Sequence, residues 1–438
     1  MRRLVLCSVA LTLTLLAACA GARTAASPPA ASGYELSNGR WWDGERFAPR
    51  TMYVVGGRFA ARRPARVDSV VNLGGGYVVP PFGDAHAHHF EAAWMIARID
   101  SMYLRDGVFY GMSLTNWANQ RPAVMPYLGR TETMDVAFAD AGITGPYGHP
   151  ILVYESLARG RYDFNPDSIR PWTDRRAEGK AYFIVDSERE LDEAWPRVMA
   201  SRPDIIKTYL VESEHHARLR LDTTRLGHVG LDPALLPSVV RRAHAAGLRV
   251  AAHVETVADM RAALDAGVDV LAHLPGYNLP AGADPATRTI TEADARRAAR
   301  QGMVVIAGPL RAALDLAETD TARFRETMAL HRANVGVLHR AGVRLAAGSD
   351  AYGQDPVPEM AYIHGLGVLG NAALLRMWSQ DTPATIFPAR RIGRLAPEWE
   401  ASLLVLACDP LGRWECTGDI RMRIKEGMRI TLPPQPAR

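Results

Sequence analysis

Short apolar segments alternate with amphipathic segments after Pro81, and this alternation constrains the fold more than any other feature of the sequence. Glycine follows several amphipathic segments, for example Gly247 and Gly267, at the place where a helix usually ends. Strands that alternate with helices are typical of βα repeats around a parallel sheet. The predicted strands are residues 109–114, 136–141, 204–210, 248–253, 268–273, 303–307 and 343–350, and the predicted helices are residues 233–246, 258–266, 291–300 and 322–341.

The segments that flank this βα part have a different character. Residues 34–79 and the residues after Arg391 read as short strands with glycine turns, which is typical of a β subdomain. The βα part between them is roughly 300 residues long, which fits an eight-stranded (β/α) barrel. We therefore expect an α/β fold with a (β/α)8 TIM-type barrel over residues 80–387. We expect residues 33–79 to pair with residues 388–432 in a small β-sandwich subdomain.

The first residues read as an export signal. Arg2 and Arg3 precede an apolar stretch that is too short to span a bilayer comfortably, so residues 1–18 are predicted to be a signal peptide. The stretch ends in Leu-Ala-Ala-Cys, which resembles a bacterial lipobox and implies that Cys19 is lipidated. The alternative is ordinary cleavage near Ala20. By the same resemblance, Ala20 favours the outer membrane, facing the periplasm. Residues 19–32 would then be a flexible tether.

Composition and charge exclude several classes of protein. The 438 residues are 48% hydrophobic and 22% charged, as in an ordinary globular protein. The net charge of +4 falls to +2 without Arg2 and Arg3, which is too low and too scattered to indicate nucleic-acid binding. We therefore expect a small-molecule partner, and membrane contact only through the anchor. Cys408 and Cys416 flank a turn, and they either pair or remain as two buried thiols.

A histidine pair follows the first apolar strand of the βα part. Because side chains in a strand alternate between faces, His86 and His88 share one face, and Asp84 shares their parity and is placed to orient them. Imidazole suits zinc and similar divalent metals. Taken alone, the pair is equally compatible with two unrelated histidines near a loop.

Polar residues also lie in or at the ends of later predicted strands. These residues are Lys207, His253, His273 and Asp350. In a (β/α) barrel the active site is built from the carboxyl ends of the strands. Six such residues in these positions predict a metal centre. The competing interpretations are a lysine that reaches solvent and an aspartate that caps a helix.

The order His-x-His, Lys, His, His, Asp resembles the amidohydrolase superfamily, specifically its binuclear members with a carboxylated lysine. Residues 81–88 (PFGDAHAH), 347–350 (AGSD) and 392–406 are similar to the family's first-strand, last-strand and closing β motifs. The resemblance covers nearly the whole chain. Pro81, Gly83 and Ser349 depart from the usual pattern without affecting a ligand position, which leaves the subfamily open.

The resemblance implies roles for each residue. His86, His88 and Asp350 would hold one metal, His253 and His273 would hold the second, and a carbon dioxide-derived carbamate on Lys207 would bridge two Zn²⁺ ions. The same ligands also suit manganese or cobalt. The carbamate is required because an ammonium group cannot bind a cation, and burial beside metals supplies the neutral amine that reacts. Asp350 would shuttle the proton of a metal-bridged hydroxide to the leaving group.

Other polar residues are expected to play lesser parts. His89 should pack on the opposite face from His88. His215 and His216 follow the lysine strand on a loop, where surface placement is favoured over substrate contact, and His244 reads as a surface residue of a helix. The candidate substrate-binding residues are Tyr209, Arg311 and Tyr352, which lie in or just past strand ends. Specificity is expected in the loops at residues 116–132, 145–176 and 212–230.

These features together predict an enzyme that hydrolyses an amide or another C–N bond in a peptide-like or N-acyl compound. The same site would also suit a lactone or phosphotriester hydrolase. A ligand-binding surface lipoprotein without catalytic activity is the alternative of a different class, although every ligand position is filled. The oligomeric state is not predicted.

Overall fold

The computed structural model describes residues 32–169 and 174–432. The predicted signal peptide, Cys19 and most of the predicted tether lie outside these residues. Within the two ranges, no helix combines the length and the apolar character needed to cross a membrane.

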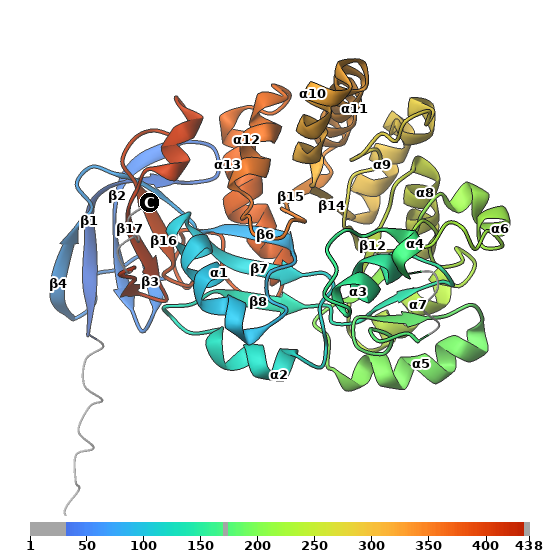
Figure 1. Ribbon diagram of the computed structural model, residues 1–438. Coiled ribbons are helices and arrows are strands. Elements are labelled where there is room, and N and C mark those ends of the chain that lie inside the picture. Colours follow the sequence, from blue (N-terminus) through green and yellow to red (C-terminus); the bar gives the residue numbers. More distant parts are fainter. Residues whose placement is uncertain (1–31, 170–173, 433–438) are drawn as a thin grey trace, which may run out of the picture.

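The strands fall into a terminal group and a central group (Figure 1). The terminal strands are β1 (Ser32–Trp42), β2 (Phe47–Val55), β3 (Arg58–Ala60), β4 (Arg66–Asn72), β5 (Tyr77–Val79), β16 (Leu403–Leu406), β17 (Ile420–Lys425) and β18 (Met428–Arg429). The central strands are β6 (Phe82–Ala87), β7 (Val108–Ser113), β8 (Asp135–Phe138), β9 (Gly142–Thr144), β10 (Tyr182–Ile184), β11 (Ile206–Tyr209), β12 (Val250–His253), β13 (Val270–Leu271), β14 (Val304–Ala307) and β15 (Arg344–Ala347).

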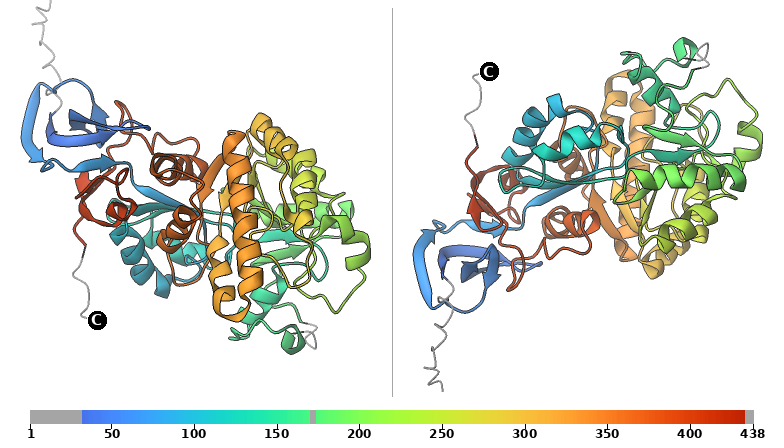
Figure 2. Two further views of the ribbon diagram at one scale, coloured as in Figure 1. Left: turned by 90° about the horizontal axis from the view of Figure 1, so that it is seen from above. Right: turned by 90° about the horizontal axis from the view of Figure 1, so that it is seen from below.

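Helices follow most of the central strands. They are α1 (Ala93–Arg105), α2 (Arg121–Val124), α3 (Ile151–Leu157), α4 (Pro166–Ile169), α5 (Glu188–Ala200), α6 (His216–Leu219), α7 (Leu236–Ala245), α8 (Val257–Ala266), α9 (Glu292–Gln301), α10 (Leu316–Thr319), α11 (Thr321–Arg340), α12 (Val357–Gly365), α13 (Asn371–Arg376) and α14 (Thr382–Ile386). The predicted helices correspond to α7, α8, α9 and α11 with small shifts at their ends. Figure 2 shows the helices around the central strands and the terminal sheet at one end of the molecule.

The two ends of the chain form one sheet, which confirms that they pair. Strand β5 lies antiparallel to β16, with Val78 opposite Val405. The sheet order is β18-β17-β16-β5-β1-β2-β3, and β4 also pairs with β1. The strand pairing therefore joins both segments in a single eight-stranded sheet, where a sandwich of two facing sheets was expected.

The central parallel strands form two sheets where a closed barrel was expected. Their orders are β6-β7-β8 and β10-β9-β11-β12-β13-β14-β15. The first interruption lies between β8 and β9, which follow each other closely in the sequence. Strand β8 pairs with β7, whereas β9 pairs with β11. Between β8 and β9, Asp140 has a left-handed φ of 57°, which turns the chain out of the ladder. Among the described residues, hydrogen-bonded pairing therefore does not join all the central strands into one closed barrel.

The second interruption lies between β15 and β6, the last and first central strands, which are in contact. The backbone N–H of Asp350 donates to the carbonyl oxygen of His86 at 2.7 Å. Ser349 donates to the Asp84 carboxylate from its backbone N–H at 3.0 Å and from its hydroxyl at 2.7 Å. Tyr103 donates to the same carboxylate at 2.9 Å. The Asp84 side chain thus replaces part of the backbone hydrogen bonding between β6 and β15. We call this contact, formed by Asp84 and His86 with Ser349 and Asp350, the closing seam.

Sequence signals explain several boundaries. Helix α8 begins with a capping box in which Thr256 and Asp259 satisfy each other's backbone N–H groups, and it ends at Gly267 with a φ of 81°. Strand β10 and helix α5 were not predicted. Yet Ser187 accepts a hydrogen bond from the backbone N–H of Glu190, and this Ser-x-x-Glu spacing is itself a helix-start signal.

The core lies between the central strands and their helices. Every residue of β6, β7, β11, β12 and β14 is buried, as expected for parallel strands covered on both faces. At the start of β6, the ring of Phe82 stacks on Trp378 with a centroid distance of 3.8 Å. Buried aromatic side chains of this size contribute much of the apolar area of a core.

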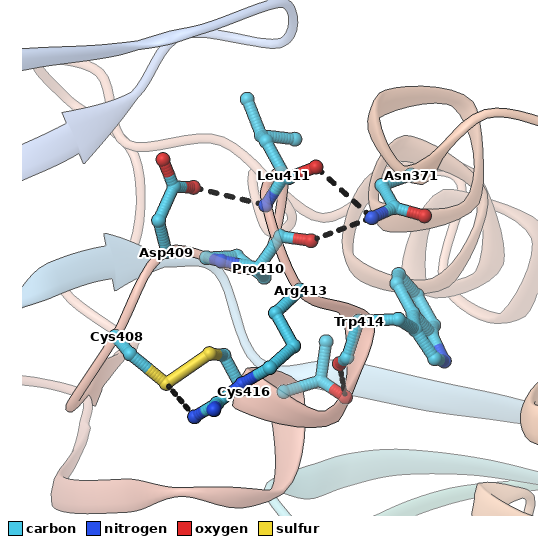
Figure 3. The surroundings of a disulfide bond; sticks show 9 residues. Asn371, Cys408, Asp409, Pro410, Leu411, Arg413, Trp414 and Cys416 are labelled. Carbon is cyan, nitrogen blue, oxygen red and sulfur yellow. Dashed lines mark hydrogen bonds between the residues drawn. A yellow bond between two sulfur atoms is a disulfide. The ribbon is translucent and has the colours of Figure 1, made fainter.

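Cys408 and Cys416 form a disulfide, which resolves the alternative left open by the sequence (Figure 3). The disulfide closes the turn between β16 and β17. Asn371, at the start of α13, donates to the carbonyl oxygens of Pro410 and Leu411 at 3.2 and 3.0 Å. The turn is therefore fixed both to itself and to a helix of the βα part.

Candidate metal centre

A cavity of about 200 Å³ opens at the carboxyl ends of the central strands. All six residues predicted to bind metal line it, and so do Tyr209 and Tyr352. The lining residues are His86, His88, Thr115, His149, Pro150, Val153, Tyr154, Phe164, Lys207, Tyr209, His253, His273, Tyr277, Asp350 and Tyr352. The structure therefore brings together side chains from β6, β11 and β12 and from the residues just after β13 and β15.

Two of the histidines are held by backbone carbonyl groups and present their Nε2 atoms to Asp350. His86 and His273 donate from Nδ1 to the carbonyl oxygens of Ala272 and Gly308 at 3.1 and 3.0 Å. Their Nε2 atoms lie 3.2 and 3.6 Å from the Asp350 carboxylate. Burial lowers the pKa of both rings, that of His273 to about 4, so both are neutral and each Nε2 offers a lone pair. The ligand atoms of all three residues lie within 4.8 Å of one another.

The position of Asp350 depends on the closing seam. Its backbone has a φ of 44°, an uncommon value for a non-glycine residue, and its N–H bonds to β6 as described above. Helix α12 begins at Val357 and its N-cap residue is Pro356. Asp350 is therefore not a helix cap, and its carboxylate faces the histidines instead.

His88 lies between two carboxylates. Its Nε2 is 2.9 Å from Asp350 and its Nδ1 is 3.5 Å from Glu91. Burial opposes a proton on this ring, but the two carboxylates outweigh burial and raise its pKa to about 9. A metal ion at this position would displace that proton, which makes metal affinity dependent on pH.

Lys207 is 2% exposed, and its amine has no hydrogen-bond partner in the part of the chain that the structure describes. Burial lowers its pKa to about 7. The side chain is therefore not a strand-end lysine that reaches solvent. A buried, partnerless amine that is largely neutral at mildly alkaline pH has the chemistry that a carbamate requires.

His253 supplies a second unsatisfied atom beside Lys207. Its Nε2 makes no hydrogen bond among the described residues and lies 3.6 Å from Glu255. The ring is also 4.6 Å from that of His273, centroid to centroid. Unsatisfied buried nitrogens are rare in proteins, and two of them beside a histidine and carboxylate cluster fit a divalent metal site.

Several residues of the cavity were not found from the sequence. His149 lies on the loop after β9, with its ring 4.6 Å from His253 and 5.3 Å from Tyr209, and burial lowers its pKa well below the usual value. Tyr277 lies on the loop after β13, 4.6 Å from the His273 ring. Both residues follow strands by several positions, where periodicity gives no signal.

Other predicted residues lie elsewhere. Arg311 is not part of the cavity wall, and its backbone N–H donates to Glu359. His89 is buried and anchors the loop of Tyr352, because it accepts from the N–H of Gly353 and donates to the carbonyl of Gln354. His215 is exposed, His216 is buried beside Asp232, and His244 pairs with Asp269 at the surface. Asp84 binds backbone and hydroxyl groups of the closing seam, and not the imidazole rings it was expected to orient.

Glu91 provides a test of ligand positioning. It accepts hydrogen bonds from Tyr154 and Tyr352 at 3.0 and 3.1 Å, and these contacts hold it near His88. We expect Glu91→Gln to weaken metal binding about 10- to 100-fold, because carboxylates behind a metal-binding histidine commonly have effects of this size. Competition with a chelator would measure the metal affinity of the variant and of the unchanged protein. Tyr352→Phe, which leaves the carboxylate in place, should change the affinity much less; equal effects would contradict this role.

The comparisons with known proteins concern the fold. No protein-family model matches the sequence, and the search of curated proteins found no match. The crystal structure of an amidohydrolase aligns with 92% of this chain and 100% of its own, with a TM-score of 0.68 and 20% identity. The crystal structure of A. niger ochratoxinase aligns with 91% of this chain and 96% of its own, with a TM-score of 0.70 and 17% identity. The crystal structure of a prolidase complexed with N-methylphosphonate-L-proline aligns with 92% of this chain and 100% of its own, with a TM-score of 0.68 and 17% identity. At these identities the likeness shows a shared architecture.

Proposed function

We propose that the protein is a metal-dependent amidohydrolase that cleaves an amide or another C–N bond in a small molecule. The observation that carries the proposal is the convergence of His86, His88, His253, His273 and Asp350 around the buried amine of Lys207. The names of the structural neighbours, an amidohydrolase, an ochratoxinase and a prolidase, support hydrolysis of this kind. The proposal includes a (β/α)8 arrangement in which the closing seam joins the first and last strands.

The donor set fits two divalent metal ions, for which zinc is the expected identity. His86, His88 and Asp350 would hold one ion, His253 and His273 the other, and a carbamate on Lys207 would bridge them. Such a pair supplies an activated water and polarises a substrate carbonyl.

The chain's own residues account for proton transfer and orientation. Asp350 accepts the proton of the attacking water and returns it to the leaving nitrogen, as a general base and then a general acid. Burial favours the neutral form of the His149 ring, which lines the cavity, so a ring N–H would donate to the substrate carbonyl oxygen. The aromatic side chains around the cavity limit the access of bulk water.

Removal and return of metal tests the proposed function. The enzyme stripped of metal should lose turnover of amide substrates, and zinc with bicarbonate should restore it. The panel should contain an N-acyl amino acid, a dipeptide, an anilide, a lactone and a phosphotriester. Turnover of the lactone or phosphotriester without any amide turnover would contradict C–N specificity. A fully metal-loaded protein that turned over none of them would favour a ligand-binding protein.

We further propose that the protein is exported and diacylated at Cys19 in the bacterial outer membrane, so that only the anchor contacts lipid. The basic and apolar start of the chain supports export. The disulfide between Cys408 and Cys416 also supports an oxidising compartment. Mass spectrometry of the N-terminal peptide should find a lipid-modified Cys19. A free α-amine at another residue would overturn the anchor.

A further inference from the structure

Most of the cavity wall away from the candidate metal ligands is aromatic and aliphatic. This part is formed by Pro150, Val153, Tyr154, Phe164, Tyr209, Tyr277 and Tyr352, and the polar residues of the wall are Thr115 and His149. Three of the tyrosine hydroxyls are bonded within the protein. Tyr154 donates to Glu91 and to the carbonyl of Thr115, Tyr352 donates to Glu91, and Tyr209 shares a hydrogen bond with the Thr115 hydroxyl. A substrate therefore meets mainly the rings of these residues.

The same wall offers no cation to an anionic substrate. Among the described residues that line the cavity there is no arginine, and Lys207 is assigned to the metal centre. Arg288 packs near Gly276, beside Tyr277, and its side chain is 3% exposed. Its guanidinium lies 3.6 Å from Glu212 and 3.9 Å from Glu255, and Glu212 also pairs with Arg225. The Arg288 guanidinium is therefore paired with carboxylates of the protein and does not line the cavity, although its Nε and Nη2 make no hydrogen bond among the described residues.

A carboxylate placed against this wall would lose its hydration without gaining an ion pair, which is strongly unfavourable. An uncharged aromatic or aliphatic group would instead gain contact with the rings. The cavity mouth is also apolar, since Phe164 and Tyr352 line it and are 37% and 44% exposed.

We infer that the substrate is an uncharged amide with an apolar, preferably aromatic, group at the scissile bond, and not a free-carboxylate dipeptide or N-acyl amino acid. This inference rests on the proposed amidohydrolase function and narrows it. It also separates this chain's substrate from the proline derivative bound by the structurally similar prolidase.

A matched pair of substrates tests the inference on the metal-loaded enzyme. 3-(4-Acetamidophenyl)propanamide and 3-(4-acetamidophenyl)propanoate have the same shape and nearly the same leaving group, and they differ by one charge. We expect kcat/KM for release of the aniline to be at least about 30-fold higher for the neutral compound. Equal rates, a preference for the propanoate, or faster turnover of a dipeptide than of both would overturn the inference and leave the amidohydrolase function standing. Absence of all amide turnover would overturn both.

A variant that adds the missing cation gives a second test. Val153, on α3, is half-buried and lines the cavity. Val153→Arg should reduce the preference for the neutral substrate at least about 10-fold, mainly by raising kcat/KM for the propanoate. Val153→Met, which adds a long uncharged side chain, should keep the preference. Circular dichroism and metal content would establish that both variants fold; if Val153→Arg did not, Phe164→Arg at the exposed mouth would replace it. An unchanged preference in a folded, metal-loaded arginine variant would overturn the inference.

Discussion

Replacing Lys207 by alanine is expected to lower kcat/KM by about three orders of magnitude or more, because the proposed metal-bridging carbamate would be lost. The amine lies among the ligands, buried and without a hydrogen-bond partner in the described residues. Without its carbamate, the second metal ion should be retained poorly. Metal analysis and steady-state kinetics on the same sample would measure both losses.

Two comparisons separate the carbamate from a merely structural lysine. Lys207→Glu keeps a carboxylate and should retain more metal than Lys207→Ala, although its shorter reach makes the bridge strained. Acetate or propionate should partly restore Lys207→Ala by entering the space left by the side chain, whereas bicarbonate should not. If Lys207→Ala kept both metals and normal turnover, the binuclear centre would be wrong, and a single metal held by His86, His88 and Asp350 would be favoured.

The same residue predicts a pH dependence of activation. Burial lowers the pKa of Lys207 to about 7 from its usual 10.5, so the fraction of reactive neutral amine increases as the pH rises through about 7. In the absence of metal, His88 holds a proton up to a pKa of about 9, which metal must displace. Activation of the metal-free enzyme by bicarbonate and zinc should therefore quicken with pH across this range.

Changing Asp350 to asparagine is the second substitution with a very large expected effect, a loss of about 10²- to 10⁴-fold in kcat, which is the usual contribution of a general acid or base. The amide has nearly the same shape and can still coordinate metal weakly, but it cannot carry the proton. Turnover should therefore fall further than metal content.

His273→Ala is the matched comparison for Asp350→Asn, because it removes a ligand that carries no proton in the proposed reaction. In that variant, metal content and activity should fall together. If metal content and activity fell in parallel in both variants, Asp350 would act only as a ligand. Normal turnover of Asp350→Asn would exclude its catalytic role.

The clustering of the candidate ligands in one cavity was predictable because these residues obey strand periodicity. His86 and His88 alternate correctly after an apolar run, and His253 and Lys207 lie within apolar strands whose other residues are buried. Such local patterns remain reliable in the folded protein because parallel strands are covered on both faces. The pairing of the two chain ends was predictable for the same reason, from strand patterns on either side of the βα part.

What escaped prediction depends on loops and on contacts between distant residues. His149 and Glu91 lie on loops, where spacing does not determine direction. Asp84 has the expected parity, but its partner Ser349 is distant in the sequence, so its part in the closing seam was not apparent. The left-handed Asp140, which interrupts the sheet, also lies in a segment whose composition resembled a continuous strand. In contrast, the start of α5 carried a readable signal at Ser187 and Glu190.

The closing seam has a consequence for the order of events during biosynthesis. His86 lies on the first central strand and Asp350 follows the last, and β16, near the end of the chain, pairs with β5 immediately before the first. Most of the polypeptide must therefore emerge before these two candidate ligands can face each other. A nascent chain would have only fragments of the binding site, and the compartment in which folding is completed would determine which metal ions the finished centre encounters.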